Sequence, residues 1–161
     1  VAIDASDRNV KTALVHAAEH GLDIDYRTTT VEALTDSGEP PFDVVLNLEV
    51  VEHVADPDAF LARSERLVRP GGLMVVATIN RTLRALAFAK IGAEYVLGWL
   101  PRGAHDPRKF VTPQDLAAAI AAAGLDVSAS AGVAYNPIAD RWRIVDDLSV
   151  NYMMTGVRRA R

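Results

Sequence analysis

The feature that most constrains the fold is a strand–helix–strand pattern in the middle of the chain. Two continuous apolar runs, FDVVLNLE at residues 42–49 and LMVVATIN at 73–80, flank a stretch with helical composition at 56–68. Asp56 is a typical helix cap and Pro57 suits the first helical position. Strands without polar alternation are typical of a parallel sheet covered on both faces, so we predict a doubly wound α/β sheet.

The rest of the chain fits the same alternation. A short strand at residues 1–4 precedes a helix that closes at Gly21, and a second helix runs from Thr112 to Gly124. The runs at 126–135 and 149–158 predict closing strands. At 161 residues, half of them apolar, the chain is predicted to form one domain over residues 1–161.

Charge and composition exclude several functional classes. The net charge of -4 argues against a nucleic-acid partner, which would require a basic face. The chain has no cysteine, so thiolate metal sites are excluded and a reducing, cytoplasmic location is expected. No apolar run reaches the length of a membrane span.

Asp4 is the first candidate binding residue, because an acid at the carboxyl end of such a strand commonly binds the two hydroxyls of a ribose. A helix cap is the equally weighted alternative. The glycine-rich turn that usually accompanies a nucleotide site is absent from the sequence. We therefore expect that a first strand and its glycine turn lie upstream, and that the chain is N-terminally truncated.

Several longer motifs resemble the ubiquinone-biosynthesis O-methyltransferases. The most specific are GAEYVLGWLPRGAHDPRKF at residues 92–110 and YNPI at 135–138, and further similar runs cover most of the chain from residue 1 to about 155. The resemblance implies a class I, Rossmann-like methyltransferase whose mostly parallel sheet has an antiparallel closing strand. It implies that S-adenosylmethionine is the cofactor and that a polyprenylated catechol or hydroxyphenol is the substrate.

An acidic cluster follows the strand at 42–49. If the chain turns helical after Leu48, Glu49, Glu52 and His53 share one face at the carboxyl edge of the sheet. The resemblance implies a divalent metal there, with Mg²⁺ expected, although His53 suits a softer ion better. Two alternatives stay open: His53 is the general base for the phenol proton, or the acids favour a helix dipole and His53 packs on a neighbour.

The resemblance also implies contacts to S-adenosylmethionine. Asp4 would bind the ribose, Leu48 would lie beside the donor, and Thr30 and Val31 are weaker candidates for the adenine edge. From the residue alone, Leu48 is an ordinary core leucine.

An amphipathic insertion is predicted at about residues 81–110. Its apolar and basic residues between 81 and 102 suit either a lid or a contact with an anionic membrane surface, which would make the protein peripheral on the inner membrane. His105 and Asp106 follow it in a predicted loop, and other ubiquinone-pathway proteins are possible partners.

Two other functions stay open: a different small-molecule methyltransferase, or a truncated remnant without catalysis. The isolated chain is expected to be inactive, because the missing strand would leave buried backbone groups unpaired.

Overall fold

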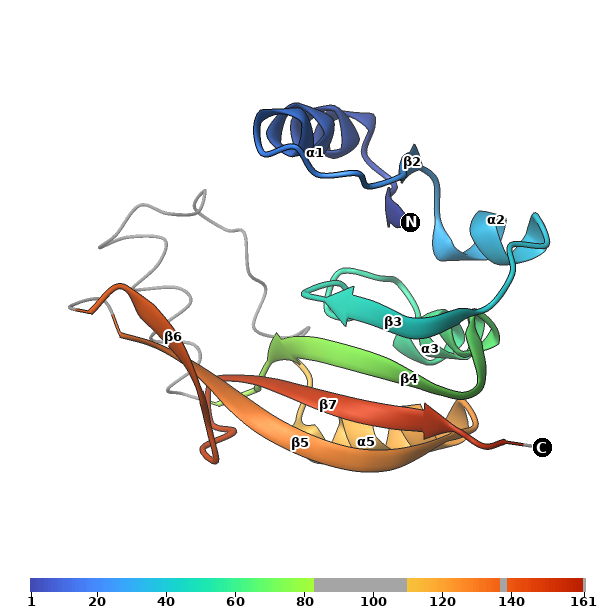
Figure 1. Cartoon of the computed structure of the whole chain (residues 1–161). Helices are drawn as coiled ribbons and strands as arrows, with labels where there is room; N and C mark the ends of the chain where they lie inside the picture. The colour runs from blue at the N-terminus through green and yellow to red at the C-terminus, as the bar shows by residue number, and fades with distance from the viewer. Residues whose placement is uncertain (83–109, 137–138, 161) are drawn as a thin grey trace. The chain divides into compact units, whose positions relative to one another are not determined.

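The computed structural model describes residues 1–82, 110–136 and 139–160 (Figure 1). It divides into two compact units, Val1–Pro40 and Pro41–Arg161. Most of the predicted insertion, with His105 and Asp106, lies outside the described residues.

The first unit contains two β–α pairs. Strand β1 (Ala2–Asp4) is followed by helix α1 (Asp7–Glu19), and strand β2 (Tyr26–Thr28) by helix α2 (Val31–Asp36). The two strands are parallel and form a sheet of their own. The Ser6 and Thr30 hydroxyls cap the two helices by accepting hydrogen bonds from the third residue beyond each.

The second unit is built on a five-stranded sheet with the order β3-β4-β7-β5-β6 (Figure 1). Its elements are β3 (Phe42–Leu48), α3 (Pro57–Arg66), β4 (Val68–Ile79), α5 (Pro113–Ala122), β5 (Leu125–Asn136), β6 (Arg141–Val145) and β7 (Asn151–Arg158). Strands β3 and β4 are parallel, and β7 is antiparallel to both of its neighbours. The predicted α/β fold with an antiparallel closing strand is therefore confirmed, whereas β6 was not predicted.

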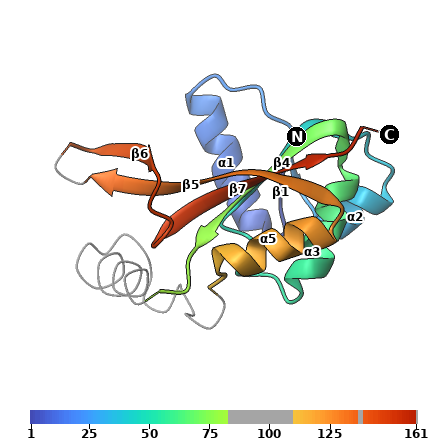
Figure 2. The same ribbon diagram turned by 90° about the horizontal axis from the view of Figure 1, so that it is seen from below.

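Helices α3 and α5 pack against each other and against β4, β5 and β7 (Figure 2). A Cβ atom on Gly156 would lie 2.7 Å from Cγ2 of Ile120, so the glycine lets α5 approach β7 closely. The largest fully buried side chains of this core are Leu61, Met74, Leu116, Ile120 and Tyr152. Among the described residues, no helix is long and apolar enough to cross a membrane.

Two details of the sequence prediction were wrong. Strand β3 is not buried on both faces, because Val44, Leu46 and Leu48 are 50%, 60% and 51% exposed. Alternate side chains of a strand point to opposite faces, so these three form one open stripe while Asn47, on the other face, is buried. The RPGG segment at 69–72 ends the helix as predicted but lies inside β4, which begins at Val68.

Candidate functional site

In the first unit, the Asp4 carboxylate is held at the carboxyl end of β1. The backbone N–H of Ser6 donates to Oδ1 at 2.7 Å, and Nδ2 of Asn9 donates to Oδ2 at 3.1 Å. A carboxylate accepts about four hydrogen bonds, so each oxygen keeps a free lone pair. A hollow of about 240 Å³ borders Asp4, Asn9 and Tyr26. The carboxylate is thus oriented and can accept further hydrogen bonds, and Asn9 is a candidate site residue that the sequence analysis missed.

Thr30 and Val31 follow β2, which pairs with β1 so that Thr28 lies opposite Asp4. The backbone N–H of Thr29 donates to the Asp4 carbonyl oxygen at 3.1 Å. The Thr30 hydroxyl is engaged as the α2 cap, and the Val31 side chain is buried. A ligand at this edge would therefore meet the backbone of Val31 rather than its side chain.

In the second unit, Leu48 is the last residue of β3. Its side chain is half-exposed, so Leu48 is not the buried core residue that its residue type alone would suggest. The next residue, Glu49, has a φ of 55°, in the left-handed region that non-glycine residues seldom adopt. Its backbone N–H donates to the carbonyl of Ala77 at 2.9 Å, which fixes the residue against β4. The chain therefore turns sharply at the carboxyl edge of the sheet.

This turn contradicts the predicted helical arrangement of the acidic cluster. Residues 49–55 form turns and bends, and helix begins only at Pro57. Glu52 is 4% exposed, whereas His53 is exposed, and the backbone N–H of His53 donates to the carbonyl of Val50 at 2.8 Å. Across the described ranges, no three His, Asp or Glu side chains group closely enough to hold a metal ion. The structure brings together Glu49 and Glu52 and leaves His53 apart.

Glu49 and Glu52 form a close carboxyl pair. One Glu52 oxygen, Oε2, accepts a hydrogen bond from the Thr78 hydroxyl at 2.9 Å, and the other, Oε1, is buried without a partner among the described residues. Glu49 as a whole residue is exposed, but its carboxyl group is desolvated, and this raises the pKa of Glu49 to about 8. The charge of the Glu52 carboxylate and the hydrogen bond between Glu49 and Glu52 raise the pKa of Glu49 further. The pair therefore tends to retain a proton near neutral pH, and it has an unused buried acceptor.

Tyr152 on β7 pairs with Thr78 on β4, next to the Glu49–Glu52 pair, and its side chain is buried in the core. Its hydroxyl donates to the carbonyl of Val111 at 3.0 Å. Burial, and then the carboxylates of Asp115 and Glu52, raise the pKa of Tyr152 far above its usual value. The phenol consequently stays neutral and serves as a hydrogen-bond donor.

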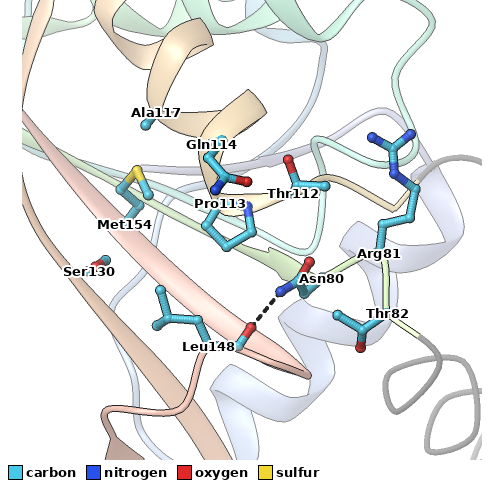
Figure 3. Close-up of a pocket in the computed structure, with 10 residues that line it drawn as sticks. All are labelled: Asn80, Arg81, Thr82, Thr112, Pro113, Gln114, Ala117, Ser130, Leu148 and Met154. Carbon is cyan, nitrogen blue, oxygen red and sulfur yellow. Dashed lines mark hydrogen bonds between the residues drawn. The ribbon is translucent and has the colours of Figure 1, made fainter.

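A larger hollow of about 590 Å³ opens where β4 ends and α5 begins (Figure 3). Polar side chains from three segments line it, including Asn80, Thr112, Gln114 and Ser130, and Met154 adds an apolar surface. The Asn80 amide donates to the Leu148 carbonyl at 2.8 Å, which ties the strand end to the segment before β7. The hollow is large enough for a ring-sized ligand, and the sequence analysis did not find it.

The methyltransferase domain family model matches residues 1–130, which is most of the chain. This chain belongs to the methyltransferase domain family. Solved structures with the same fold include a SAM-dependent methyltransferase from Thermotoga maritima, described as a possible histamine N-methyltransferase (TM-score 0.61, 15% identity, 98% of this chain and 72% of that one). Another is a magnesium protoporphyrin IX methyltransferase from Synechocystis (TM-score 0.64, 17% identity, 97% and 62%). At such low sequence identity, the similarity to these structures supports the class I methyltransferase fold and nothing more specific.

Closer sequence relatives of this methyltransferase domain carry one shared description. Proteins described as ubiquinone biosynthesis O-methyltransferase are 59% identical over 98% of the chain in Parvibaculum lavamentivorans and 57% identical over 99% in Brucella anthropi. The chain spans 62% and 64% of the length of these two relatives.

Proposed function

We propose that the protein containing this chain transfers a methyl group from S-adenosylmethionine to a phenolic oxygen of a polyprenylated catechol in ubiquinone biosynthesis. The observation that carries the proposal is the 59% identity, over nearly the whole chain, to a relative described as a ubiquinone biosynthesis O-methyltransferase. The geometry is compatible with it, because the candidate residues lie at the carboxyl ends of β1 and β3, where ligands bind in such sheets.

For the donor, Asp4 would accept hydrogen bonds from the two ribose hydroxyls. Its two oxygens are held in place by Ser6 and Asn9, so little ordering cost remains when the ligand binds. Leu48 offers an apolar side chain to the donor, and the backbone after β2, at Thr30 and Val31, would face the adenine.

For the acceptor, the Glu49–Glu52 pair would take the phenol proton when no cation is bound to it. The phenolate oxygen then attacks the methyl carbon in line with the breaking carbon–sulfur bond, and the sulfur leaves with the bonding electrons as neutral S-adenosylhomocysteine. The sulfonium is already activated, so alignment supplies most of the rate and deprotonation the rest. His53 remains the alternative base.

A divalent cation, with Mg²⁺ expected, would be held by Glu49 and Glu52. The fit is supported by the unpartnered Oε1 of Glu52 and by the mutual repulsion of the two carboxylates. When bound, such an ion stabilises a phenolate. Mg²⁺ keeps several waters, so two carboxylates are a sufficient protein contribution without His53.

The polyprenyl tail of the substrate would reside in a membrane. Residues 81–102 would therefore contact the anionic surface of the inner membrane, and other ubiquinone-pathway proteins would be partners there. The support for this contact is the amphipathic, basic sequence pattern of the segment, since residues 83–109 are outside the described part.

The test is donor turnover by the full-length protein, measured as S-adenosylhomocysteine release. We expect release only when a polyprenylated catechol is supplied, and none with the same ring already methylated at the reacting oxygen. Equal turnover with an unrelated phenol or amine would favour a different small-molecule methyltransferase, and no turnover with any acceptor would favour a non-catalytic remnant.

A further inference from the structure

Two histidines lie side by side at the C-terminal end of helix α1 in the first unit. His16 is in the last turn of the helix and His20 is its C-cap, so they are four residues apart and share one helix face. Both residues are exposed, and their rings stack with centroids 4.2 Å apart and an angle of 30° between the ring planes. Two nitrogen-bearing rings are thus presented together to solvent.

A hydrogen bond to the backbone fixes the tautomer of His20. Its Nδ1 lies 2.9 Å from the carbonyl oxygen of His16. A carbonyl oxygen can only accept, so Nδ1 carries the hydrogen and, in the neutral ring, Nε2 keeps a free lone pair. Histidines that bind metal ions are held in the same way, with one ring nitrogen donating to a carbonyl or carboxylate oxygen. His20 is therefore oriented as an Nε2 ligand.

The His16 ring can supply the second ligand. No hydrogen bond among the described residues involves this ring, so it can turn about its Cβ–Cγ bond. Two imidazoles that bind one ion at about 2.0–2.1 Å and at a right angle have centroids roughly 4.5 Å apart. The observed separation of 4.2 Å is close to that value. Opening the angle between the ring planes would therefore direct both lone pairs to one ion without moving the helix.

We propose that His16 and His20 together bind one divalent transition-metal ion, with water in the remaining coordination positions. Imidazole nitrogens suit Zn²⁺, Ni²⁺ and Cu²⁺, whereas Mg²⁺ prefers oxygen ligands, so this ion differs from the one proposed for Glu49 and Glu52. The negative end of the α1 dipole and the carboxylate of Glu19, in the same turn, favour a cation at this position. Neither histidine takes part in the proposed methyl transfer.

Such an ion would hold the C-terminal end of α1 together. The buried residues of this helix are Val10 and Ala17, and the chain leaves it through Gly21, which has a φ of 63°. One ligand on the C-cap and another one turn earlier would oppose fraying of this end. Because only the folded helix keeps the two rings close together, binding of the ion should stabilise the folded state.

The test is calorimetric titration of the full-length protein with Ni²⁺, in the presence of excess Mg²⁺ to fill oxygen sites. His16→Gln and His20→Gln should each lower the Ni²⁺ affinity about tenfold or more, because the remaining imidazole can no longer chelate. The double variant should bind little more weakly than either single variant, since both histidines act as one unit. Both side chains are exposed, so the fold should survive these substitutions.

A variant with one histidine moved separates a chelate from two independent surface histidines. His16→Gln combined with Val15→His keeps the number of histidines but places them five residues apart, on different faces of the helix. Val15 is 60% exposed, so the helix should accept the new side chain. This variant should bind Ni²⁺ as weakly as His16→Gln alone. If it binds as tightly as the unchanged protein, or if the single variants do, the proposal is overturned.

Two further readouts check the ligands and the stabilising role. The electron paramagnetic resonance spectrum of bound Cu²⁺ should show two imidazole nitrogens in the unchanged protein and one in each single variant. Ni²⁺ should raise the melting temperature of the unchanged protein and have little effect on that of the double variant. A Cu²⁺ spectrum without imidazole nitrogens, or an equal rise in melting temperature in the double variant, would place the ion elsewhere and overturn the proposal.

Discussion

Replacing Glu52 by Gln is predicted to make the protein more stable and less active. The Glu52 side chain is buried, one of its oxygens has no partner among the described residues, and the Glu49 carboxyl lies beside it. A buried polar atom left unpaired costs about 1–3 kcal/mol. Glutamine keeps an acceptor for the Thr78 hydroxyl and, because it is neutral, removes the buried charge and the carboxylate repulsion that helps to raise the pKa of Glu49. The free energy of unfolding should therefore rise by about 1–3 kcal/mol, or roughly 2–10 °C in melting temperature.

The assay is urea unfolding of the full-length protein at pH 7, with and without added Mg²⁺. Wild-type protein should be stabilised by Mg²⁺, because the ion binds the folded carboxyl pair, and the Glu52→Gln variant should not respond. Glu65→Gln is the matched control. Glu65 pairs with Arg158 at 2.7 Å and is 15% exposed, so that substitution should lower stability by up to about 1 kcal/mol.

A loss of stability in Glu52→Gln comparable to that in Glu65→Gln would contradict this prediction. Glu52 would then be a structural acceptor whose second oxygen is satisfied in solution. A Mg²⁺ response that survives the substitution would remove the pair as the cation site.

Three further predictions concern the donor and the pH. Asp4→Ala should weaken S-adenosylmethionine binding by about 1.5–3 kcal/mol. The control Asp23→Ala removes an exposed charge in the same unit and should leave the affinity unchanged. Equal affinities of the two variants by calorimetry would show that Asp4 does not bind the donor. Asn9→Ala should have a smaller effect of about 0.5–1.5 kcal/mol, since only the orientation of Asp4 is lost. The raised pKa of Glu49 means that the folded state holds this proton more tightly than the unfolded state, so its contribution to stability is present below about pH 4.5 and declines as pH rises through about 8. The glutamine in Glu49→Gln cannot ionise, so the melting temperature of this variant should rise relative to that of the wild type between pH 5 and about 9. Parallel curves of melting temperature against pH would contradict the raised pKa of Glu49.

The regular elements were predictable because their signals are local. Asp56 and Thr112 do cap α3 and α5, each accepting from the backbone three residues on, and a proline follows each cap as expected. The antiparallel direction of β7 came from the family resemblance, because the apolar pattern of a strand does not encode its direction. Strand β6 has an alternating RWRIV sequence but only five residues, so its pattern is too short to stand out.

The site was harder to predict, because it depends on backbone geometry that the residue spacing does not fix. Helical spacing after Leu48 would gather Glu49, Glu52 and His53, but the left-handed backbone at Glu49 breaks the helix and separates the histidine. The bond from Thr78 to Glu52 joins residues 26 positions apart and has no local signal. Asn9 was missed for the opposite reason, since an asparagine in the first helical turn is ordinary and its bond to Asp4 appears only when the fold is known.

The proposed function requires that the methyl group goes to a phenolic oxygen of a polyprenylated catechol. The most direct measurement follows carbon-13 from the labelled methyl of S-adenosylmethionine by NMR, with the full-length protein and a vesicle-embedded polyprenyl catechol. We expect the label to appear as an aryl methyl ether, and to do so far more slowly when Glu49 and Glu52 are both replaced by Gln. Label on a ring carbon or a nitrogen, or label that appears on a different class of acceptor, would contradict it.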